Sequence, residues 1–550
     1  MSKPLRVSVA IVGGGPVGLC LAMDLAWRGI DCLIIERRRA GEPPSVKCNH
    51  VSSRTMEAFR RLGFADEVRA AGLPDDYPHD VVLRTRATGH ELTRIHIPCR
   101  RDRFTDTSGP DGWWPTPEPP HRINQLFLEP VLFRNAVAMP RLTIVNRNEF
   151  VGFEQDDDGV SVRSRDLETG EELSVRAAFL VGCEGGRSIV RREIGAKLEG
   201  DEIVQRVQSS YVRAPDLIRR VTKPDAWMSY LYNPDRAGNL IAIDGRATWL
   251  IHNYLLPHEA GFETVDRDRC IRTLLGVGSD FHYELLGTED WIGRRLVADR
   301  FRDRRAFICG DSAHLWVPYA GYGMNAGIAD AMNLSWMLAA HLKGWAPQAI
   351  LDPYERERQP ITEQVSRFAM GHAEGAIRER TSVPAYLEDD TEDGRLARRE
   401  VGEAAYRLHV QQFACAGLNY GYFYSRSPII SYDGEPPPLY TMHDYTPSTV
   451  PGCRTPHLWL RDGRSLYDAI GPDYTLLRFD RRADPSVLLS AAADAGVPLA
   501  LLDVEADEIP DAYRHRLVLN RPDGHVAWRG DEPPAAARAL IERIRGGARD

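Results

Sequence analysis

The chain has 550 residues, too many for one hydrophobic core, so we expect two or three domains. Its composition, 43% hydrophobic and 27% charged, is that of a folded globular protein and argues against disorder or a fibre. The net charge of −9, without a basic block, argues against nucleic acid as the main partner.

Membrane and disulfide patterns are also missing from the sequence. No apolar run approaches the roughly 18–20 residues that span a bilayer, and no small-residue cleavage site follows the N-terminus. The nine cysteines are scattered singly without a CxxC pair, which fits reduced thiols better than disulfides or a zinc site. We therefore expect a cytoplasmic protein with no membrane span and no metal site.

The first predicted elements form a strand, a turn, a helix and a second strand. Residues 6–12 are a short β-branched run typical of a buried parallel strand, and a glycine-rich turn follows at 13–18. A helical stretch leads to a second buried strand, 31–35, which ends at Glu36. This order predicts a dinucleotide site, although the motif alone does not separate FAD from NAD.

Each position of this motif has a physical role. Gly13 permits the tight turn, Gly15 lets the backbone approach a pyrophosphate, and Gly18 lets helix and strand pack closely. The helix N-terminus offers free N–H groups to phosphates, and Glu36 lies where a carboxylate accepts hydrogen bonds from ribose hydroxyls. We assign cofactor binding here to Gly13, Gly15, Pro16, Val17, Gly18, Glu36 and Arg37.

Four later segments add polar and glycine motifs in a fixed order. They are Lys47-Cys-Asn-His-Val-Ser-Ser-Arg54, the helix start Arg122-Ile-Asn-Gln125, the strand end Leu-Val-Gly-Cys-Glu184-Gly185, and Gly310-Asp311-Ser-Ala-His314, which continues through Pro318 to Gly321-Tyr-Gly323-Met324-Asn325. Together with the first motif they resemble the class A flavoprotein monooxygenases, the family of para-hydroxybenzoate hydroxylase. The resemblance covers residues 5 to about 360 and is closest to the phenol and chlorophenol hydroxylase branch.

The resemblance implies how these segments hold FAD. Asp311 would bind the ribityl chain, and the turn formed by Gly321, Gly323, Met324 and Asn325 would direct N–H groups at the isoalloxazine N1/O2 edge. Gln125 would contact FAD. Lys47 and Arg54 belong to the segment in which an arginine of relatives reaches the FAD phosphates. Glu184 replaces the usual aspartate and moves the carboxylate outward by one methylene.

Two predicted strands, 226–232 and 248–254, would belong to an antiparallel sheet that roofs the substrate pocket in relatives. Alternation places Met228, Tyr230 and Tyr232 on one face of the first strand. It groups Leu250, His252 and Tyr254 on one face of the second, and we include His252 and Tyr254 among the catalytic candidates. Which faces look inward stays open.

The catalytic base is the least defined part of the predicted site. Some relatives carry an acid or a histidine five residues before the Arg54 equivalent, whereas this chain has Asn49 followed by His50. An amide cannot take a proton, so the base would be His50, a tyrosine, a water chain, or none. A neutral imidazole with a pKa near 6.5 would suit that task. Pro318 is typical of oxygen-inserting relatives, and His314 fits a structural role near the flavin.

The rest of the chain predicts a separate C-terminal unit. A charge-rich helical stretch, 361–412, and a proline-rich linker precede it. A strand at 474–479, a helix at 484–495, a strand at 499–504, a hairpin at 516–528 and a helix at 534–545 suggest a thioredoxin-like fold. Without a CxxC pair this unit would be structural, packing on the main body or on a partner subunit.

We therefore expect an α/β protein with a discontinuous Rossmann-like FAD-binding domain, 1–360, that contains a mainly antiparallel substrate sheet at about 75–120 and 190–300. A helical and linker region, 361–435, and a thioredoxin-like domain, 436–550, would follow. The resemblance implies an NAD(P)H-consuming monooxygenase that uses FAD and O2 to hydroxylate a phenolic ring through a C4a-hydroperoxyflavin. NADH or NADPH as reductant and a homodimer stay open. The alternatives are an FAD oxidase or dehydrogenase acting by hydride transfer, and a flavin-binding redox sensor.

Overall fold

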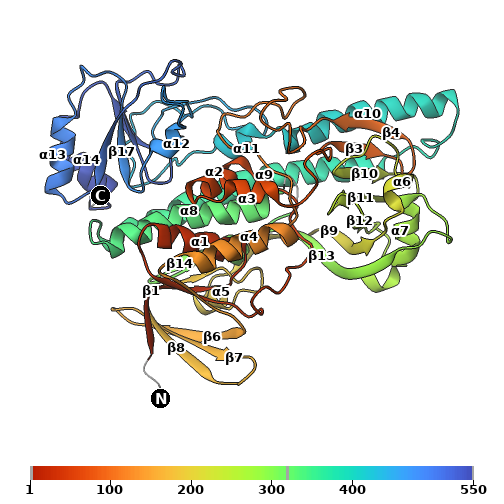
Figure 1. The fold of residues 1–550 in the computed structure, drawn as a ribbon, viewed down its shortest axis with the longest axis horizontal. Coiled ribbons are helices and arrows are strands. Elements are labelled where there is room, and N and C mark those ends of the chain that lie inside the picture. The colour runs from red at the N-terminus through yellow and green to blue at the C-terminus, as the bar shows by residue number, and fades with distance from the viewer. Residues whose placement is uncertain (1–3, 318–320, 548–550) are drawn as a thin grey trace.

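The computed structural model describes residues 4–317 and 321–547, apart from the side chain of Glu202. Figure 1 shows an elongated molecule in which two sheets and a smaller C-terminal unit are joined by long helices. None of the described helices is long and apolar enough to cross a bilayer.

The first sheet has a parallel core in the order β15-β8-β1-β2-β5, and the short strand β14 extends it beyond β15. Its core strands are β1 (Leu5–Val12), β2 (Cys32–Ile35), β5 (Leu142–Val145), β8 (Glu172–Gly182) and β15 (Ala306–Ile308). β6 (Asn148–Gln155) and β7 (Val160–Asp166) continue from β8 as an antiparallel hairpin, and β14 spans Arg302–Asp303. The predicted strand–turn–helix–strand unit is therefore confirmed.

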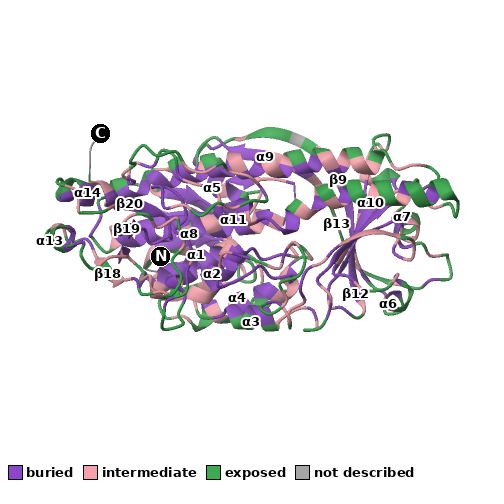
Figure 2. Cartoon of the chain, turned by 90° about the horizontal axis from the view of Figure 1, so that it is seen from above, coloured by how far each residue is buried: buried purple, intermediate pink, exposed green. Residues whose placement is uncertain are grey.

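Helices cover this sheet because its central strands are apolar on both sides. All four residues of β2 and the last four of β1 are buried. The helices around the sheet are α1 (Pro16–Trp27), α2 (Ser53–Arg61), α3 (Ala65–Ala70), α4 (Gln125–Ala138), α5 (Ile189–Glu193) and α8 (Tyr322–Leu342). Figure 2 shows α1 and α8 in the buried centre of the molecule.

The second sheet runs in the order β16-β13-β9-β12-β11-β10-β3-β4. Neighbouring strands pair antiparallel except β10 and β3, which are parallel. The strands are β3 (Val81–Arg84), β4 (Glu91–Ile95), β9 (Leu198–Arg213), β10 (Met228–Tyr232), β11 (Ala237–Ala242), β12 (Thr248–Tyr254), β13 (Glu284–Ala298) and β16 (His314–Leu315). α6 (Leu217–Arg220) and α7 (Arg267–Leu275) lie in its connections.

Two long helices, α9 (Pro353–Thr381) and α10 (Glu392–Phe413), link the sheets, and the short α11 (Ala416–Tyr420) follows. α9 contacts α8 of the first part and β13 of the second, and α10 packs on β4. The predicted domain boundary at residue 360 falls inside α9, which continues through Pro360.

The C-terminal unit has a four-stranded sheet in the order β18-β17-β19-β20. β17 (Tyr474–Arg478) and β18 (Leu499–Asp503) are parallel, with α13 (Ser486–Asp494) between them in sequence. The antiparallel β19 (Leu517–Asn520) and β20 (Val526–Gly530) precede α14 (Ala537–Ile544), and α12 (Leu466–Ala469) leads in. The unit packs on the main body of the same chain: the Arg521 guanidinium donates to Glu357 of α9 at 2.6 and 2.8 Å.

Candidate active site

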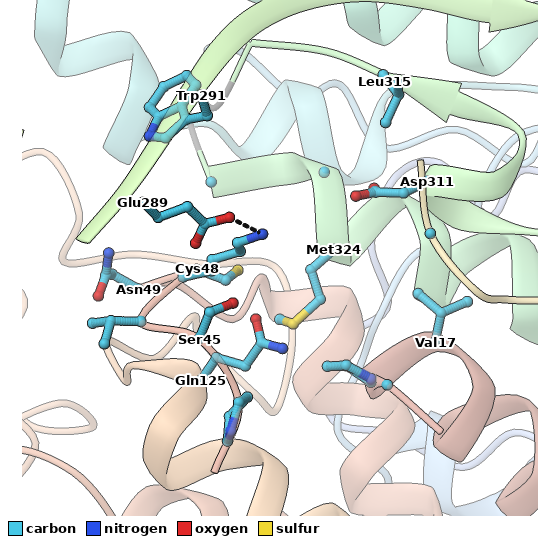
Figure 3. Close-up of a pocket in the computed structure, with 18 of the residues that line it drawn as sticks. Val17, Ser45, Cys48, Asn49, Gln125, Glu289, Trp291, Asp311, Leu315 and Met324 are labelled. Carbon is cyan, nitrogen blue, oxygen red and sulfur yellow. Dashed lines mark ion pairs between the residues drawn. The ribbon is translucent and has the colours of Figure 1, made fainter. Parts of the chain in front are cut away.

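One cavity of about 910 Å³ connects the carboxyl ends of the first sheet with the inner face of the second. The amino ends of α1 and α8 both border it, through Gly15 and Pro16 and through Gly323 and Met324. Helix N-termini carry unpaired N–H groups and a positive dipole end, which favour anionic groups. Figure 3 shows part of this cavity, with Val17 of α1, Gln125 of α4 and Met324 of α8 around it.

The three fingerprint glycines have different surroundings. A Cβ on Gly13, whose φ is +103°, would lie 2.5 Å from the Cys183 carbonyl oxygen, and a Cβ on Gly18 would clash with the Gly13 carbonyl. These two glycines therefore serve close packing, and Gly18 does not line the cavity. A Cβ on Gly15 would meet no atom within 4 Å, so the backbone there is open for a phosphate.

Glu36 follows β2 and borders the cavity beside Arg37. Its carboxylate accepts hydrogen bonds from the Gly14 N–H at 2.5 Å and from the Arg38 N–H and Nε at 2.8 and 3.1 Å. The side chain is thus held in place by these hydrogen bonds, where its oxygens can also accept from a ribose. The exposed Arg37 also lines the cavity, as predicted from its place after Glu36.

The glycine-rich turn before α8 forms the opposite edge of the cavity. Gly321 caps the helix in the left-handed conformation, with φ +59°, and Gly321, Gly323 and Met324 line the cavity. The Asn325 side chain instead braces the turn: it donates to the Gly321 and His50 carbonyls at 2.7 and 3.1 Å and accepts from the Ser52 N–H at 2.8 Å. In the structure the Asn325 amide therefore holds protein loops together, and its role in cofactor binding stays a prediction.

The two carboxylates of the second and third fingerprints have different partners. Asp311 faces the cavity and accepts no hydrogen bond from the described residues; enclosure by protein raises its pKa, while His314 and Lys47 act to lower it. Glu184 accepts from the Val190 N–H at 2.8 Å and the Ser312 hydroxyl at 3.3 Å. The longer glutamate side chain therefore holds the start of α5, and Asp311 is free for a ligand.

The basic residue at position 47 is placed as predicted, but the one at 54 is not. Lys47 lines the cavity and pairs with Glu289 of β13 at 2.5 Å (Figure 3). Arg54, in the first turn of α2, does not line it, and its guanidinium carbon lies 4.7 Å from the ring centroid of Tyr422. In the structure α2 directs the Arg54 side chain toward the C-terminal segment, and its role at the cofactor stays a prediction.

Gln125, the first residue of α4, lines the cavity and donates to Glu129 at 2.9 Å. Asn49 also lines the cavity, and its side-chain Oδ1 accepts a hydrogen bond from the Asn124 side-chain amide at 2.5 Å. The amide of Asn49 is thus used in fixing the loop before α4. Pro318, a catalytic candidate from the sequence, lies outside the described residues.

The second sheet presents its predicted side chains to the cavity. Met228 and Tyr230 of β10 and Leu250, His252 and Tyr254 of β12 all line it, so the sheet topology resolves which faces look inward. Tyr232 is absent from the lining and stays in the core near His409.

His252 is neutral in this environment. Its Nδ1 lies 2.7 Å from the Ser209 hydroxyl, which also accepts from the Trp291 indole at 2.8 Å. Burial lowers the pKa of His252 to about 4. Tyr254 lies under the Arg380 guanidinium, whose carbon is 4.5 Å from the ring centroid.

His50 is buried between the α8 turn and Arg122. A Cβ on Gly321 would lie 2.9 Å from the His50 Cβ, and the Arg122 guanidinium bonds to His50 Nδ1. Burial lowers the pKa of His50 well below 6.5, and Arg122, His121 and Arg103 lower it further. The expectation of an imidazole that titrates near neutral pH is therefore wrong.

Several lining residues were not identified as site residues from the sequence. They include Arg122, which begins the Gln125 motif, and Trp227, Asn239, Trp291, Gln412 and Phe413. Gln412 and Phe413 end α10, far along the chain from β10 and β12. No local motif marks them, because only the packing of α10 on the second sheet brings them to the cavity.

The residues at the first-sheet end fit FAD. The open backbone at Gly15, the fixed carboxylate of Glu36, the second helix N-terminus at α8 and Asp311, which has no hydrogen-bond donor among the described residues, lie along one cavity. This series suits a pyrophosphate, a ribose, a polyhydroxyl chain and a ring that carries negative charge.

Comparisons with known proteins agree with this fit. Residues 6–369 match the family described as FAD binding domain, and residues 448–548 match the aromatic-ring hydroxylase C-terminal family. The tetracenomycin A2 monooxygenase-dioxygenase of Streptomyces glaucescens is 31% identical over 98% of this chain and 97% of its own length. The phenol 2-monooxygenase of a Pseudomonas strain is 29% identical, with coverage of 99% and 93%.

The fold is shared with solved structures as well. The rebeccamycin biosynthetic enzyme RebC with reduced flavin superposes with a TM-score of 0.89 at 34% sequence identity, covering all of both chains. The family match spans well over half of the chain and includes both the cofactor motifs and the substrate sheet. This chain belongs to the FAD-dependent aromatic-ring hydroxylases, and it is a flavin monooxygenase.

Proposed function

We propose that this monooxygenase hydroxylates a phenolic aromatic ring that lies between the α8 turn and the inner face of the second sheet. The observation that carries the proposal is the single cavity that joins the cofactor motifs to the aromatic face formed by Trp227 and Tyr230. A relative named phenol 2-monooxygenase supports the substrate class.

The cofactor roles follow from the positions of the lining residues. Gly15 and the α1 N-terminus would hold the pyrophosphate, Glu36 the ribose, Asp311 the ribityl chain, and the α8 turn at Gly323 the polar edge of the ring. FAD, when bound, supplies the transfer of electrons from NAD(P)H to O2 and of one oxygen atom to the substrate.

The substrate end of the cavity has apolar and aromatic lining. Met228, Ile241, Leu250 and Phe413 contribute apolar side chains, and Trp291 adds an aromatic edge. Exclusion of water protects reactive oxygen species from side reactions and strengthens electrostatic interactions in the site. Apolar and aromatic lining of this kind favours an aromatic ring over a sugar or a peptide.

A screen of phenols tests the proposal. The purified protein with its FAD is mixed with NADH or NADPH in air, and the rate of reductant oxidation is followed with and without each phenol, with mass spectrometry of the products. We expect at least one phenol to accelerate oxidation and to gain one oxygen atom. An FAD oxidase would produce hydrogen peroxide without an oxygenated product, and a redox sensor would show no turnover.

Two further expectations belong to this proposal. The nine cysteines are all free, which supports a cytoplasmic protein. A homodimer and the division into 1–360, 361–435 and 436–550 stay predictions; sedimentation velocity tests the first and limited proteolysis the second.

A further inference from the structure

Arg122 is a buried cation in the wall of the substrate cavity. It precedes α4, is 2% exposed, and lines the cavity together with His50 and Gln412. Its guanidinium carbon lies 5.1 Å from the Trp227 ring centroid and 5.6 Å from that of Phe413. Two aromatic faces thus flank the charge, in keeping with cation–π contact.

The hydrogen-bonding capacity of Arg122 is largely unused. Nη1 bonds to His50 Nδ1, while Nε and Nη2 have no hydrogen-bond partner among the described residues. The nearest carboxylate is Asp111, 4.0 Å from Nη2, and Asp111 is already bonded to Arg103 at 2.7 Å and to the Trp114 indole at 2.9 Å. A buried guanidinium left in this state is unfavourable unless another acceptor arrives.

The surroundings of Arg122 are net positive. The arginines that act on the histidines of this region are Arg69, Arg100, Arg103 and Arg122. Arg69 has its own carboxylates, Glu118 and Asp66, and near Arg122 itself the two guanidinium groups of Arg122 and Arg103 face one carboxylate, Asp111. Burial and these arginines keep the pKa values of His50, His79 and His121 well below 6.5, so the histidines add no charge at neutral pH. The unbalanced charge faces the cavity next to the apolar side chains of Trp227, Ile241 and Phe413.

We infer that the part of the cavity between Arg122, Trp227 and Phe413 is an oxyanion subsite, which binds an anionic oxygen carried by the substrate's aromatic ring, as a phenolate or a carboxylate. The inference deepens the proposed function and rests on it. A phenol that binds here gives up its proton to the buffer, and the oxygen is held as the anion by Arg122.

This assignment explains how the site operates without a general base at positions 49 and 50. Asn49 cannot accept a proton, and His50 receives a hydrogen bond from Arg122 on Nδ1, which leaves its ring proton on Nε2. An electron-rich phenolate is then favoured by the adjacent positive charge rather than by proton transfer to a side chain.

Matched probes test the subsite. The dissociation constants of 2-naphthoate and 2-naphthamide are measured at pH 7 with the FAD-loaded protein, by quenching of tryptophan fluorescence. The probes differ in charge but hardly in shape, and we expect the carboxylate to bind at least about tenfold more tightly. Arg122→Met should abolish the preference, and Arg122→Lys should keep part of it.

Arg100→Met is the matched control, because it removes the same charge from a residue that does not line the cavity. It should keep the naphthoate preference. If Arg122→Met loses FAD or fails to fold, the comparison of the two probes on the wild-type protein still decides the question. Equal affinities in the wild type, or a preference that persists in FAD-loaded Arg122→Met, would overturn a carboxylate subsite.

A second arm separates phenolate from carboxylate. The ionisation of bound 2-naphthol is followed by its phenolate absorbance across pH 6–10, and the subsite should lower the apparent pKa of the bound phenol by about one unit or more, a tenfold change in ionisation. Naphthoate preference alone identifies a carboxylate site, and the naphthol shift alone a phenolate site. Absence of both contradicts the inference. Neither readout depends on turnover, so the proposed hydroxylation can fail separately.

Discussion

The backbone at Gly15 faces the cavity with no atom where a side chain would begin, and this opening is the most specific mark of the cofactor site. We expect Gly15→Val to weaken FAD binding by at least about tenfold, because the added methyl groups would occupy the approach to the pyrophosphate. FAD content after purification, read from its absorbance, is the measurement. Gly471→Val is the control, since Gly471 also has open space around it but does not line the cavity. Stoichiometric FAD in Gly15→Val would show that the site is misplaced.

We expect Asp311 to contribute to FAD binding and Glu184 to the stability of the fold. Asp311→Ala should raise the dissociation constant of FAD more than Glu184→Ala, because Asp311 faces the cavity without a hydrogen-bond donor from the described residues. Glu184→Ala should lower the unfolding free energy of the apoprotein by about 0.5–2 kcal/mol, the range for a lost helix cap, since Glu184 accepts from the Val190 N–H. FAD titration and urea unfolding of both variants check the pair. Equal FAD affinities would refute this order.

His50 should not titrate during catalysis. Its pKa lies well below 6.5 owing to burial and to Arg122, so the ring stays neutral from pH 6 to 9. We therefore expect the pH dependence of phenol-stimulated turnover to have the same shape in the wild type and in His50→Gln over that range. An ionisation near neutral pH that vanishes in the variant would restore His50 as a base.

At the scale of the elements, local sequence predicted the first strand–helix–strand unit, β10, β12 and the C-terminal unit, but not strands such as β9 and β13, nor how distant elements meet. The run at 6–12, the glycines and the run at 31–35 were sufficient because a parallel strand buried on both faces has an unbroken apolar sequence. The C-terminal strands and helices were also placed to within a few residues. The continuous helix through Pro360 was not predicted, because a proline usually marks a helix boundary, whereas Pro360 lies within α9.

The inward faces of β10 and β12 show what the sequence leaves open. Alternation grouped His252 with Tyr254, but only the pairing of both strands with β11 decided that these groups face the same cavity. Arg54 shows a further limit, because its motif position does not reveal that α2 directs the side chain toward Tyr422. Arg122 could have been suspected only from its position next to Gln125.

The docking of the C-terminal unit depends on a buried ion pair between β19–β20 and α9. Arg521 is fully buried and donates to both Glu357 oxygens, and Asp523 accepts from it at 2.9 Å. Arg521→Met should destabilise the protein by about 3–5 kcal/mol, because it leaves buried carboxylates without their cation. Arg516→Met, at an exposed arginine 3.6 Å from Asp480, should cost less than about 1 kcal/mol. Urea unfolding followed by tryptophan fluorescence checks both, and equal effects would mean that the interface does not depend on this pair.

For the whole molecule, buried histidines predict acid sensitivity. Burial is the main cause that lowers the pKa of eight described histidines. The pKa falls to about 4 for His252 and His457 and to about 3 for His79 and His525. The other four are His50, His121, His341 and His372. The pKa of His96 is instead raised, because it bonds to Asp106 and Asp80. In the unfolded chain these groups take up protons below about pH 6.5, while the folded protein resists protonation. Stability should therefore fall as the pH drops from 6.5 toward 4, by up to about 1.4 kcal/mol per pH unit for each histidine.

Urea unfolding of the FAD-loaded protein at pH 8, 6.5 and 5 measures this dependence. These histidines should change the free energy of unfolding little between pH 8 and 6.5, and they should lower it clearly by pH 5. A stability that is flat or that rises on acidification would contradict the buried neutral histidines of the structure.

The central claim is that one cavity brings a flavin and an aromatic ring together so that an oxygen atom from O2 is inserted into the ring. The direct measurement is turnover of the best phenol from the screen under ¹⁸O2 with NAD(P)H, followed by mass spectrometry of the product. We expect one ¹⁸O atom in each hydroxylated product and a product yield that accounts for most of the reductant consumed. Oxidation of NAD(P)H that yields only hydrogen peroxide, with every phenol recovered unchanged, would contradict it.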